Sequence, residues 1–332
     1  MSEARKRILV IRRRALGDLV CSLPALEDLR AAFPDAVIDL VMDAPWVQAA
    51  LAWAAVDRVL VVPPGLFDRI RFALGVRRAG YDLVVDLLST PQTALLSWLT
   101  GARRRVGLDL QGRAWAYTER VTRPGSAADR AGRPTYVGDA LRAVVAAALP
   151  SAPRAQTKAA ASTRPVHVPP RLAIAPGATW SAKAWPAPAY AEVARLALAH
   201  AHAEVTVFWG PGEESLAREI CAAAPGSSLA PGGTIVELGE RLQHFDLLVS
   251  GDSGVRHLAH ALGLRTVSVF GPTDPWTQTP PGPGHRFLRY PIACAPCQRA
   301  ECALARNYCL TEITAEQVWE EAATLLSSVG AA

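Results

Sequence analysis

The stretch Ile8–Pro24, ILVIRRRALGDLVCSLP, indicates the fold class of this chain. It opens with four apolar residues, the pattern of a buried strand, and runs through a loop into a helix that ends before Pro34. Apolar residues recur along that helix at helical spacing: Leu19, Leu23, Leu26, Leu29 and Phe33. A buried strand that leads into such a helix starts a βαβ unit, from which parallel sheets are built.

This alternation continues along the chain and predicts an α/β fold with two doubly wound, Rossmann-like domains facing a cleft. The strands predicted in the first half are Ile8–Arg12, Val37–Met42, Arg58–Val62, Asp82–Leu88 and Arg105–Gly107. Those predicted in the second half are Leu172–Ala175, Glu204–Phe208, Asp246–Ser250 and Thr266–Phe270. Helices are predicted at Ala187–His200, Glu213–Ala223, Thr234–Leu242, Val255–Leu262 and Ala315–Ser327.

Length and hydropathy agree with this organisation. The chain has 332 residues, which suits two domains of roughly 150 residues each. Pro150–Pro170 is rich in Pro, Ala, Ser and Thr and is predicted to link domains 1–160 and 161–313. No apolar run approaches the ~18 residues of a membrane-spanning helix, which excludes an integral membrane protein. Ile8–Ile11 is too short for the apolar part of a signal peptide, so we expect a cytoplasmic protein.

Charge is distributed unevenly between the two halves. Residues 1–165 carry a net charge of +9 and residues 166–332 one of −4, within a total of +5. This asymmetry indicates an anionic partner for the first half, or else a solvated surface in an arginine-rich sequence. The first half contains two groups of consecutive arginines, Arg12–Arg14 and Arg103–Arg105.

Asp18 is the first candidate functional residue. It follows the first predicted strand and lies at the start of the first helix, at the carboxyl end of the sheet. A carboxylate there caps the helix, or acts as a general base for a substrate bound in the cleft. Position alone leaves both interpretations open.

A second candidate is the loop after the strand Leu172–Ala175, whose sequence is PGATWSAKAWP. Its small residues, the hydroxyls of Thr179 and Ser181 and the ammonium of Lys183 are the chemistry of an anion site. The chain has 32 arginines and three lysines, so a lysine in this loop suggests a compact cation for a phosphate. The alternative is an ordinary surface lysine.

The third and fourth candidates follow neighbouring strands of the second half. In GDSGVRH, Ser253 and Gly254 begin a helix whose N–H groups can bind an anion, while Asp252 is suited to accept sugar hydroxyls. His257 is either part of that site or structural. Thr273, in FGPTDP, lies on the same predicted sheet edge or in a simple turn.

Four cysteines occur close together near the end of the chain, with the spacing C-x2-C-x4-C-x6-C: Cys294, Cys297, Cys302 and Cys309. Four thiolates can enclose a structural zinc or iron ion, and the alternatives are disulfides or free thiols. Four protein ligands would leave no open position for catalysis. The chain lacks G-x-G-x-x-G after a strand and G-x-x-x-x-G-K-[ST], so dinucleotide and P-loop sites are not supported.

In their order and spacing these motifs resemble glycosyltransferase family 9, the lipopolysaccharide heptosyltransferases, over nearly the whole chain. The matching segments are ILVIR…GDLV…LPAL, PGA…SAKAWP, GDSG…HLA, FGPTDP and the cysteine segment. The resemblance implies a GT-B fold, with the acceptor bound mainly by the first domain and the nucleotide sugar by the second. Residues 314–332 would form a helix that crosses back to the first domain.

The resemblance also implies residue roles. Asp18 corresponds to the proposed general base, Lys183 to the lysine on the donor phosphates and Asp252 to the residue that holds the donor sugar. Ser253, Gly254 and His257 correspond to diphosphate contacts, and either Glu213 or Glu214 to the acid on the ribose. Arg256 departs from the family pattern and is a candidate for contact with the diphosphate or for a change in donor preference.

The implied reaction is inverting transfer of a heptose from a nucleoside diphosphate sugar, with ADP-heptose expected, to a lipopolysaccharide inner-core glycolipid. No catalytic metal and no nucleic acid is expected to take part. Arg12, Arg13 and Arg14 would bind the phosphorylated acceptor at the inner face of the cytoplasmic membrane. Alternatives are another nucleotide sugar or a protein acceptor, or a non-catalytic nucleotide-sugar or metal-binding protein.

Overall fold

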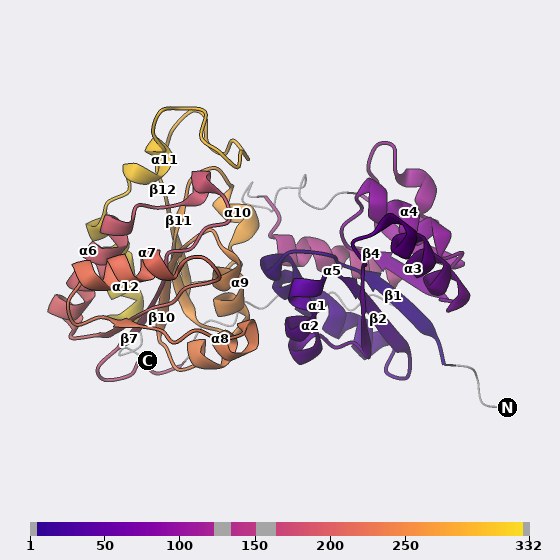
Figure 1. Ribbon diagram of the computed structural model, residues 1–332, viewed down its shortest axis with the longest axis horizontal. Helices are drawn as coiled ribbons and strands as arrows, with labels where there is room; N and C mark the ends of the chain where they lie inside the picture. Colours follow the sequence, from indigo (N-terminus) through magenta and orange to yellow (C-terminus); the bar gives the residue numbers. More distant parts are fainter. Residues whose placement is uncertain (1–4, 123–133, 151–163, 328–332) are drawn as a thin grey trace. The chain divides into compact units, whose positions relative to one another are not determined.

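The computed structural model describes residues 5–122, 134–150 and 164–327 (Figure 1). The chain divides into two compact units, Met1–Lys158 and Ala159–Ala332. The predicted linker Pro150–Pro170 contains this division, and its residues 151–163 lie outside the described residues. Each unit has a parallel sheet of six strands.

The first sheet has the strand order β3-β2-β1-β4-β5-β6, with β1 between β2 and β4. Its strands are β1 (Arg7–Ile11), β2 (Val37–Met42), β3 (Arg58–Val61), β4 (Leu83–Asp86), β5 (Arg104–Leu108) and β6 (Glu119–Val121). The chain winds from β1 to β3 in one direction and then returns to β4 beside β1. A ligand site is expected at the carboxyl ends of β1 and β4, where the direction of winding changes.

Helices cover both faces of this sheet. They are α1 (Leu16–Ala32), α2 (Val47–Trp53), α3 (Leu66–Arg78), α4 (Pro91–Leu99) and α5 (Val137–Ala148), with short turns η1 (Ala44–Trp46) and η2 (Ala114–Ala116). Helices α1 and α5 pack against each other, and α3 packs against α4. Phe72 and Val76 of α3 and Leu96 of α4 bury their side chains against Leu9 and Ile11 of β1.

The second sheet has the order β12-β11-β10-β7-β8-β9. Its strands are β7 (Arg171–Ala175), β8 (Glu204–Val207), β9 (Ser228–Leu229), β10 (Leu247–Gly251), β11 (Arg265–Phe270) and β12 (His285–Arg289). Winding changes direction between β7 and β10, so these two strands define the corresponding ligand position of the second unit.

The helices of the second unit are α6 (Ala187–Ala201), α7 (Glu214–Ala223), α8 (Ile235–Leu242), α9 (Gly254–Ala261), α10 (Pro275–Gln278), α11 (Tyr308–Thr311) and α12 (Ala315–Ser327), with the turn η3 (Ser181–Lys183). A core of apolar residues from α6, α7 and α12 covers one face of the sheet, and α9 contacts β10 and β11. Helix α12 packs on α6, β10 and β11. Its predicted return to the first domain stays a prediction, and residues 328–332 lie outside the described residues.

The predicted α/β class with two doubly wound domains is confirmed, and the predicted strands and helices are present with ends that match or differ by one or two residues. Three strands were not predicted: β6, β9 and β12. Two are very short, all three lie at the edges of their sheets, and β12 has only one buried residue. Their sequences therefore lack the continuous apolar run of a central strand. Among the described residues, no helix is both long and apolar enough to cross a membrane.

Candidate functional site

The carboxyl ends of β7, β10 and β11 lie next to one another at one edge of the second sheet. Each of these strands is followed by a predicted site residue: Lys183 in η3 after β7, Asp252 after β10 and Thr273 after β11. Parallel pairing brings the three loops together although they are far apart in sequence. The sheet topology thus assembles the three side chains into one polar cluster.

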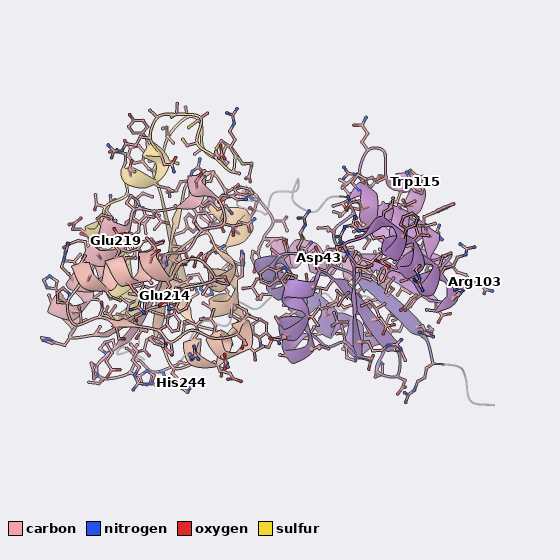
Figure 2. All side chains as sticks on the ribbon, viewed as in Figure 1. Asp43, Arg103, Trp115, Glu214, Glu219 and His244 are labelled. Atoms are coloured by element: carbon pink, nitrogen blue, oxygen red, sulfur yellow. The ribbon has the colours of Figure 1, made fainter. Side chains whose placement is uncertain are left out.

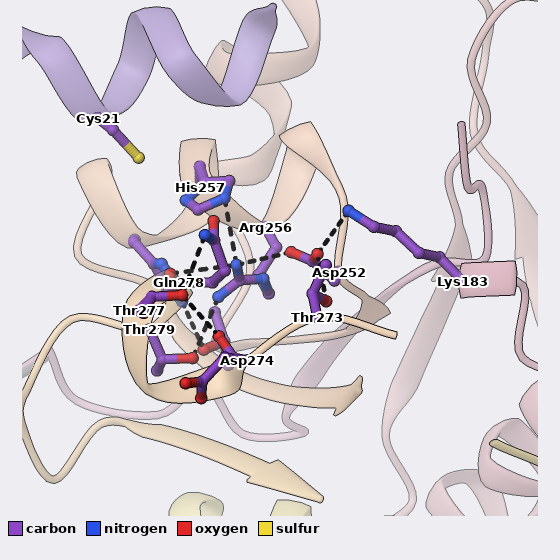
Figure 3. A network of polar contacts seen from close by, with 12 residues as sticks. Cys21, Lys183, Asp252, Arg256, His257, Thr273, Asp274, Thr277, Gln278 and Thr279 are labelled. Carbon is purple, nitrogen blue, oxygen red and sulfur yellow. Dashed lines mark hydrogen bonds and ion pairs between the residues drawn. The ribbon is translucent and has the colours of Figure 1, made fainter. Parts of the chain in front are cut away.

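Asp252 is the centre of this cluster (Figure 3). Its Oδ2 lies 2.6 Å from Nζ of Lys183 and accepts a hydrogen bond of 2.8 Å from the hydroxyl of Thr273. Its Oδ1 accepts a hydrogen bond of 3.1 Å from Nη2 of Arg256. Burial raises the pKa of the Asp252 carboxyl, but the charges of Arg256 and Lys183 outweigh burial and hold that pKa well below its usual value. Asp252 is therefore a charged, fully oriented acceptor.

Arg256, for which the sequence leaves contact with the diphosphate or a change in donor preference open, is a partner of Asp252 in the structure. Its side chain is completely buried. Besides Asp252, it donates to the carbonyl oxygen of Gln278 at 3.2 Å and to the hydroxyl of Thr279 at 3.4 Å. Its guanidinium also lies 5.0 Å from the centre of the Phe270 ring. Arg256 is thus a buried partner of Asp252, and the spacing of four residues between them was the signal in the sequence.

His257 lies within the same cluster. Its Nε2 is 3.2 Å from Nη2 of Arg256, and since an arginine can only donate, Nε2 accepts and the ring hydrogen is on Nδ1. Burial and the charge of Arg256 lower the pKa of His257 to about 3. At neutral pH the ring is uncharged, so it can contribute a hydrogen bond to a ligand but no positive charge.

The start of α9 supplies further donors beside Asp252. Ser253 is the residue before the helix and Gly254 is its first residue, so their N–H groups have no acceptor within the helix. The Ser253 hydroxyl is buried and has no hydrogen-bond partner among the described residues. A helix start with an unpaired hydroxyl is suited to the oxygens of a phosphate.

Lys183 combines access to solvent with a fixed position. Its side chain is 17% exposed, against 5% for Asp252, and its ammonium lies 4.4 Å from the centre of the Trp180 ring. Nearby, the hydroxyl of Ser181 donates to the carbonyl oxygen of Ala300 at 3.3 Å, whereas Thr179 is exposed. Ser181 therefore ties the loop to the cysteine segment, and Thr179 and Lys183 are open to solvent, Lys183 in part. The donor contacts expected of these three residues stay predictions.

The structure separates the two candidate acids after β8. The carboxylate of Glu213 accepts a hydrogen bond of 2.8 Å from the N–H of Gly210. It also packs against Gly177, so closely that a Cβ added to Gly177 would lie about 2.1 Å from the nearest carboxylate oxygen. Glu214 instead points outward on α7 and forms an exposed ion pair with Arg218 (Figure 2). Glu213 is thus next to the loop after β7, and which of the two acids contacts a ribose stays a prediction.

In the first unit, Asp18 is engaged in two local contacts. Its Oδ2 accepts a hydrogen bond of 2.9 Å from the N–H of Ala15, which is the predicted capping interaction, and its Oδ1 lies 2.5 Å from Nη2 of Arg12. The Asp18 side chain remains 44% exposed. Capping therefore leaves it accessible, and its role as a base stays a prediction.

The predicted acceptor arginines differ from one another. Arg12 is buried, pairs with Asp18 and donates to the carbonyl oxygen of Leu87 at 2.9 Å, which joins the ends of β1 and β4. Arg13 pairs with Asp43 at 3.0 Å, and Arg14 is exposed. Arg12 orients the carboxylate of Asp18, and Arg14 is the most accessible of the three to a ligand.

Residues 69–307 match the family model of glycosyltransferase family 9 (heptosyltransferase), and this span contains the whole Asp252 cluster. The chain belongs to glycosyltransferase family 9. Lipopolysaccharide heptosyltransferase 1 of Pseudomonas aeruginosa is 27% identical over 327 residues, which cover 89% of this chain and 87% of that protein. The sequence prediction of a heptosyltransferase-type glycosyltransferase is thereby confirmed at the level of the family.

Solved structures agree on the fold of this family 9 chain. The Escherichia coli heptosyltransferase WaaC with ADP matches 96% of this chain and 99% of its own with a TM-score of 0.76 at 23% identity. The iron-containing glycosyltransferase TibC of Escherichia coli matches 98% of this chain and 77% of its own with a TM-score of 0.54 at 16% identity. The GT-B fold predicted from the sequence is confirmed.

The cysteine segment of this family 9 chain does not form the expected metal site. All four cysteines are described and are free thiols, and the described residues contain no group of three or more metal-ligating side chains. Cys294 and Cys297 are exposed. Sγ of Cys309 packs against Gly271, so closely that a Cβ added to Gly271 would lie only 3.0 Å from it. Burial and the neighbouring thiols of Cys302, Cys294 and Cys297 raise the pKa of Cys309. The residues as placed do not fit a tetrahedral ion.

Proposed function

We propose that this family 9 chain is an inverting transferase that moves a heptose from ADP-heptose to the phosphorylated inner-core glycolipid of lipopolysaccharide. The observation that carries this proposal is the buried cluster at the ends of β7, β10 and β11. It combines a charged acceptor, Asp252, with an accessible ammonium, Lys183, and a helix start with open donors. A nucleotide sugar presents both matching parts, hydroxyls on the sugar and oxygens on the diphosphate.

In the proposed reaction the donor is bound by the second unit. Lys183, Ser253 and Gly254 bind the diphosphate, Asp252 accepts hydrogen bonds from sugar hydroxyls, and Glu213 accepts them from the ribose. Negative charge grows on the diphosphate as its bond to the anomeric carbon breaks, so donors already in place stabilise the transition state more than the ground state.

The acceptor hydroxyl is proposed to be activated by Asp18. The hydroxyl oxygen attacks the anomeric carbon, its proton passes to the Asp18 carboxylate, and the nucleoside diphosphate leaves from the opposite face. This requires both units to reach the same sugar during turnover. Arg12 supports the step because it fixes the carboxylate from one side, and Arg14 is the proposed contact for an acceptor phosphate.

The proposal is tested with purified protein, a donor panel and a lipid A–Kdo acceptor. The panel holds ADP-heptose, ADP-glucose and UDP- and GDP-sugars, so that another donor is identified if ADP-heptose is wrong. We expect acceptor-dependent consumption of ADP-heptose, and loss of turnover by ~10²-fold or more in Asp18→Asn with donor binding retained. Turnover by Asp18→Asn equal to wild type would refute the assignment of the base. Transfer to a protein and not to the glycolipid would refute the acceptor.

The proposed place of the reaction is the cytoplasmic side of the inner membrane, where a glycolipid acceptor is embedded and a soluble nucleotide sugar is available. Fractionation of cells that express the tagged full chain tests this. Recovery outside the cytoplasmic and inner-membrane fractions would contradict it.

A further inference from the structure

Helix α3 has two apolar sides, and only one of them faces the core. Phe72 and Val76 pack inward against the first sheet. Leu66, Ile70 and Leu74 are spaced four residues apart, and Phe67 lies beside them, so these four share the other side. Their exposed fractions are 72%, 50%, 47% and 81% in the order Leu66, Ile70, Leu74 and Phe67. We call this side the outer face of α3.

Single exposed apolar residues are common on proteins, but four large ones on one helix side are not. Two tryptophans on neighbouring elements extend the feature. Helix α4, which contacts α3, exposes 49% of Trp98, and η2 exposes 55% of Trp115, whose ring meets that of Trp98 edge to face at 6.0 Å. Figure 2 shows Trp115 and Arg103 at the outer rim of the first unit, beside α4 and α3.

The charges around the outer face are almost all positive. Helix α3 carries four arginines, Arg69, Arg71, Arg77 and Arg78, against one acid, Asp68. All four arginines are exposed, as is Arg103 before β5. By contrast, Arg12, Arg13 and Arg104 of the arginine groups noted in the sequence are paired with acids. The free basic surface of the first unit therefore includes α3.

We propose that the outer face of α3 docks the first unit onto an anionic lipid surface. A helix with exposed leucine, isoleucine and phenylalanine, flanked by arginines, inserts its apolar side below the headgroups while the cations meet the phosphates. Tryptophans are favoured at the same depth because their rings are apolar and their N–H groups are polar. A second copy of the chain is disfavoured as occupant, since it would bring the two sets of arginines together.

The test uses the full chain and sedimentation with phosphatidylethanolamine vesicles, with and without phosphatidylglycerol. We expect binding that needs phosphatidylglycerol and weakens with salt. The double variant Phe67→Ser/Ile70→Ser should weaken the apparent affinity by about tenfold or more. Leu51→Ser on α2 is the matched control, because Leu51 is 59% exposed but outside the outer face, and its binding should equal wild type.

Thermal melting shows whether the apolar double variant is folded. If it is not, the charge variant Arg71→Gln/Arg78→Gln provides the test. This charge variant should melt like wild type but lose binding to phosphatidylglycerol vesicles. Equal binding to vesicles without phosphatidylglycerol, or unchanged binding of both double variants, would overturn the proposal. The proposal would also be overturned if the wild-type chain bound no vesicles and formed a dimer that these substitutions dissociate. The assay contains no donor or acceptor, so its outcome is separate from that of the proposed reaction.

Discussion

Arg256 donates to Oδ1 of Asp252 at 3.1 Å from a completely buried position, while the partly exposed Lys183 lies 2.6 Å from Oδ2. The carboxylate therefore has one fully buried cation and one partly exposed cation. A buried carboxylate without any cation is costly. In the proposed reaction Lys183 also contacts a donor phosphate, and Arg256 would then keep the charge of Asp252 neutralised.

Arg256→Met is expected to destabilise the second unit by about 3–5 kcal/mol, because it leaves a buried carboxylate with Lys183 alone. In variant protein that still folds, the pKa of Asp252 should rise, so the acid limb of the pH profile of donor binding should move to higher pH. Denaturant unfolding and donor titration at several pH values measure both effects. The control is Arg218→Met, which breaks an exposed pair on α7 and should change neither. An unshifted acid limb in folded Arg256→Met would contradict the role given to Arg256.

Lys183→Met is expected to lower kcat/KM for the donor by roughly 10²–10³-fold, since it removes the partly exposed cation that is proposed to bind the diphosphate. Stability should change much less than in Arg256→Met because Arg256 still neutralises Asp252. Steady-state kinetics and thermal melting provide the two measurements. Lys6→Met, at an exposed lysine before β1, serves as the comparison and should leave kinetics unchanged. A Lys183→Met enzyme with normal kcat/KM would remove Lys183 from the site.

Glu213→Gln is expected to raise the donor KM by roughly tenfold or more, because a charge-assisted hydrogen bond to the ribose becomes a neutral one. The amide oxygen can still accept from the N–H of Gly210, so the loop should keep its conformation. Glu214→Gln is a matched control one residue away, and it should leave KM unchanged. If the two variants show the opposite ranking, the assignment of the ribose contact is wrong.

Acid should destabilise the second unit through its buried histidines. Burial lowers the pKa of His257 to about 3 and of His285 to about 4, and the pKa of His260 also falls well below its usual value. Each lowered value means that the unfolded chain binds more protons, so stability is present above about pH 6.5 and is lost as pH falls toward 4.

The measurement is the free energy of unfolding from pH 7.5 to 4.5 in wild type and His285→Phe. The lowered pKa of His285 alone corresponds to at most about 3 kcal/mol of unfolding free energy, which is lost as the pH falls from 6.5 to about 4. His285→Phe should therefore flatten the pH dependence, even if it is less stable at pH 7.5. An identical slope in both proteins would show that His285 is already accessible to protons in the folded state.

Chelation should leave the fold intact, because the described residues contain no group of three or more side chains placed to hold a metal ion. We expect the melting temperature of the purified chain to be unchanged after treatment with a strong chelator, with elemental analysis before and after. A bound stoichiometric metal whose removal lowers the melting temperature would reinstate the structural ion predicted from the cysteine spacing. Cys294→Ser/Cys297→Ser would then show whether these two residues hold it.

The sequence by itself determined the α/β class, most of the strands, half of the α-helices and the loops that carry the candidate residues. These properties depend on local periodicity: a continuous apolar run marks a central parallel strand, and apolar residues at helical spacing mark a covering helix. The edge strand β9, with only two residues, has no such signal. The apolar runs of the central strands also mark where those strands end. The sequence therefore identified three residues that follow strand ends: Lys183, Asp252 and Thr273.

Only the tertiary structure decided which of these residues meet and in what state. It placed Glu213 against the loop after β7 and Glu214 in an exposed ion pair with Arg218, although the two acids are neighbours in sequence. It buried Arg256 against Asp252 and paired Arg12 with Asp18, so each of these arginines orients a carboxylate. Ion pairing and burial depend on which strands lie side by side, and that order is a property of the folded sheet rather than of any local stretch of sequence.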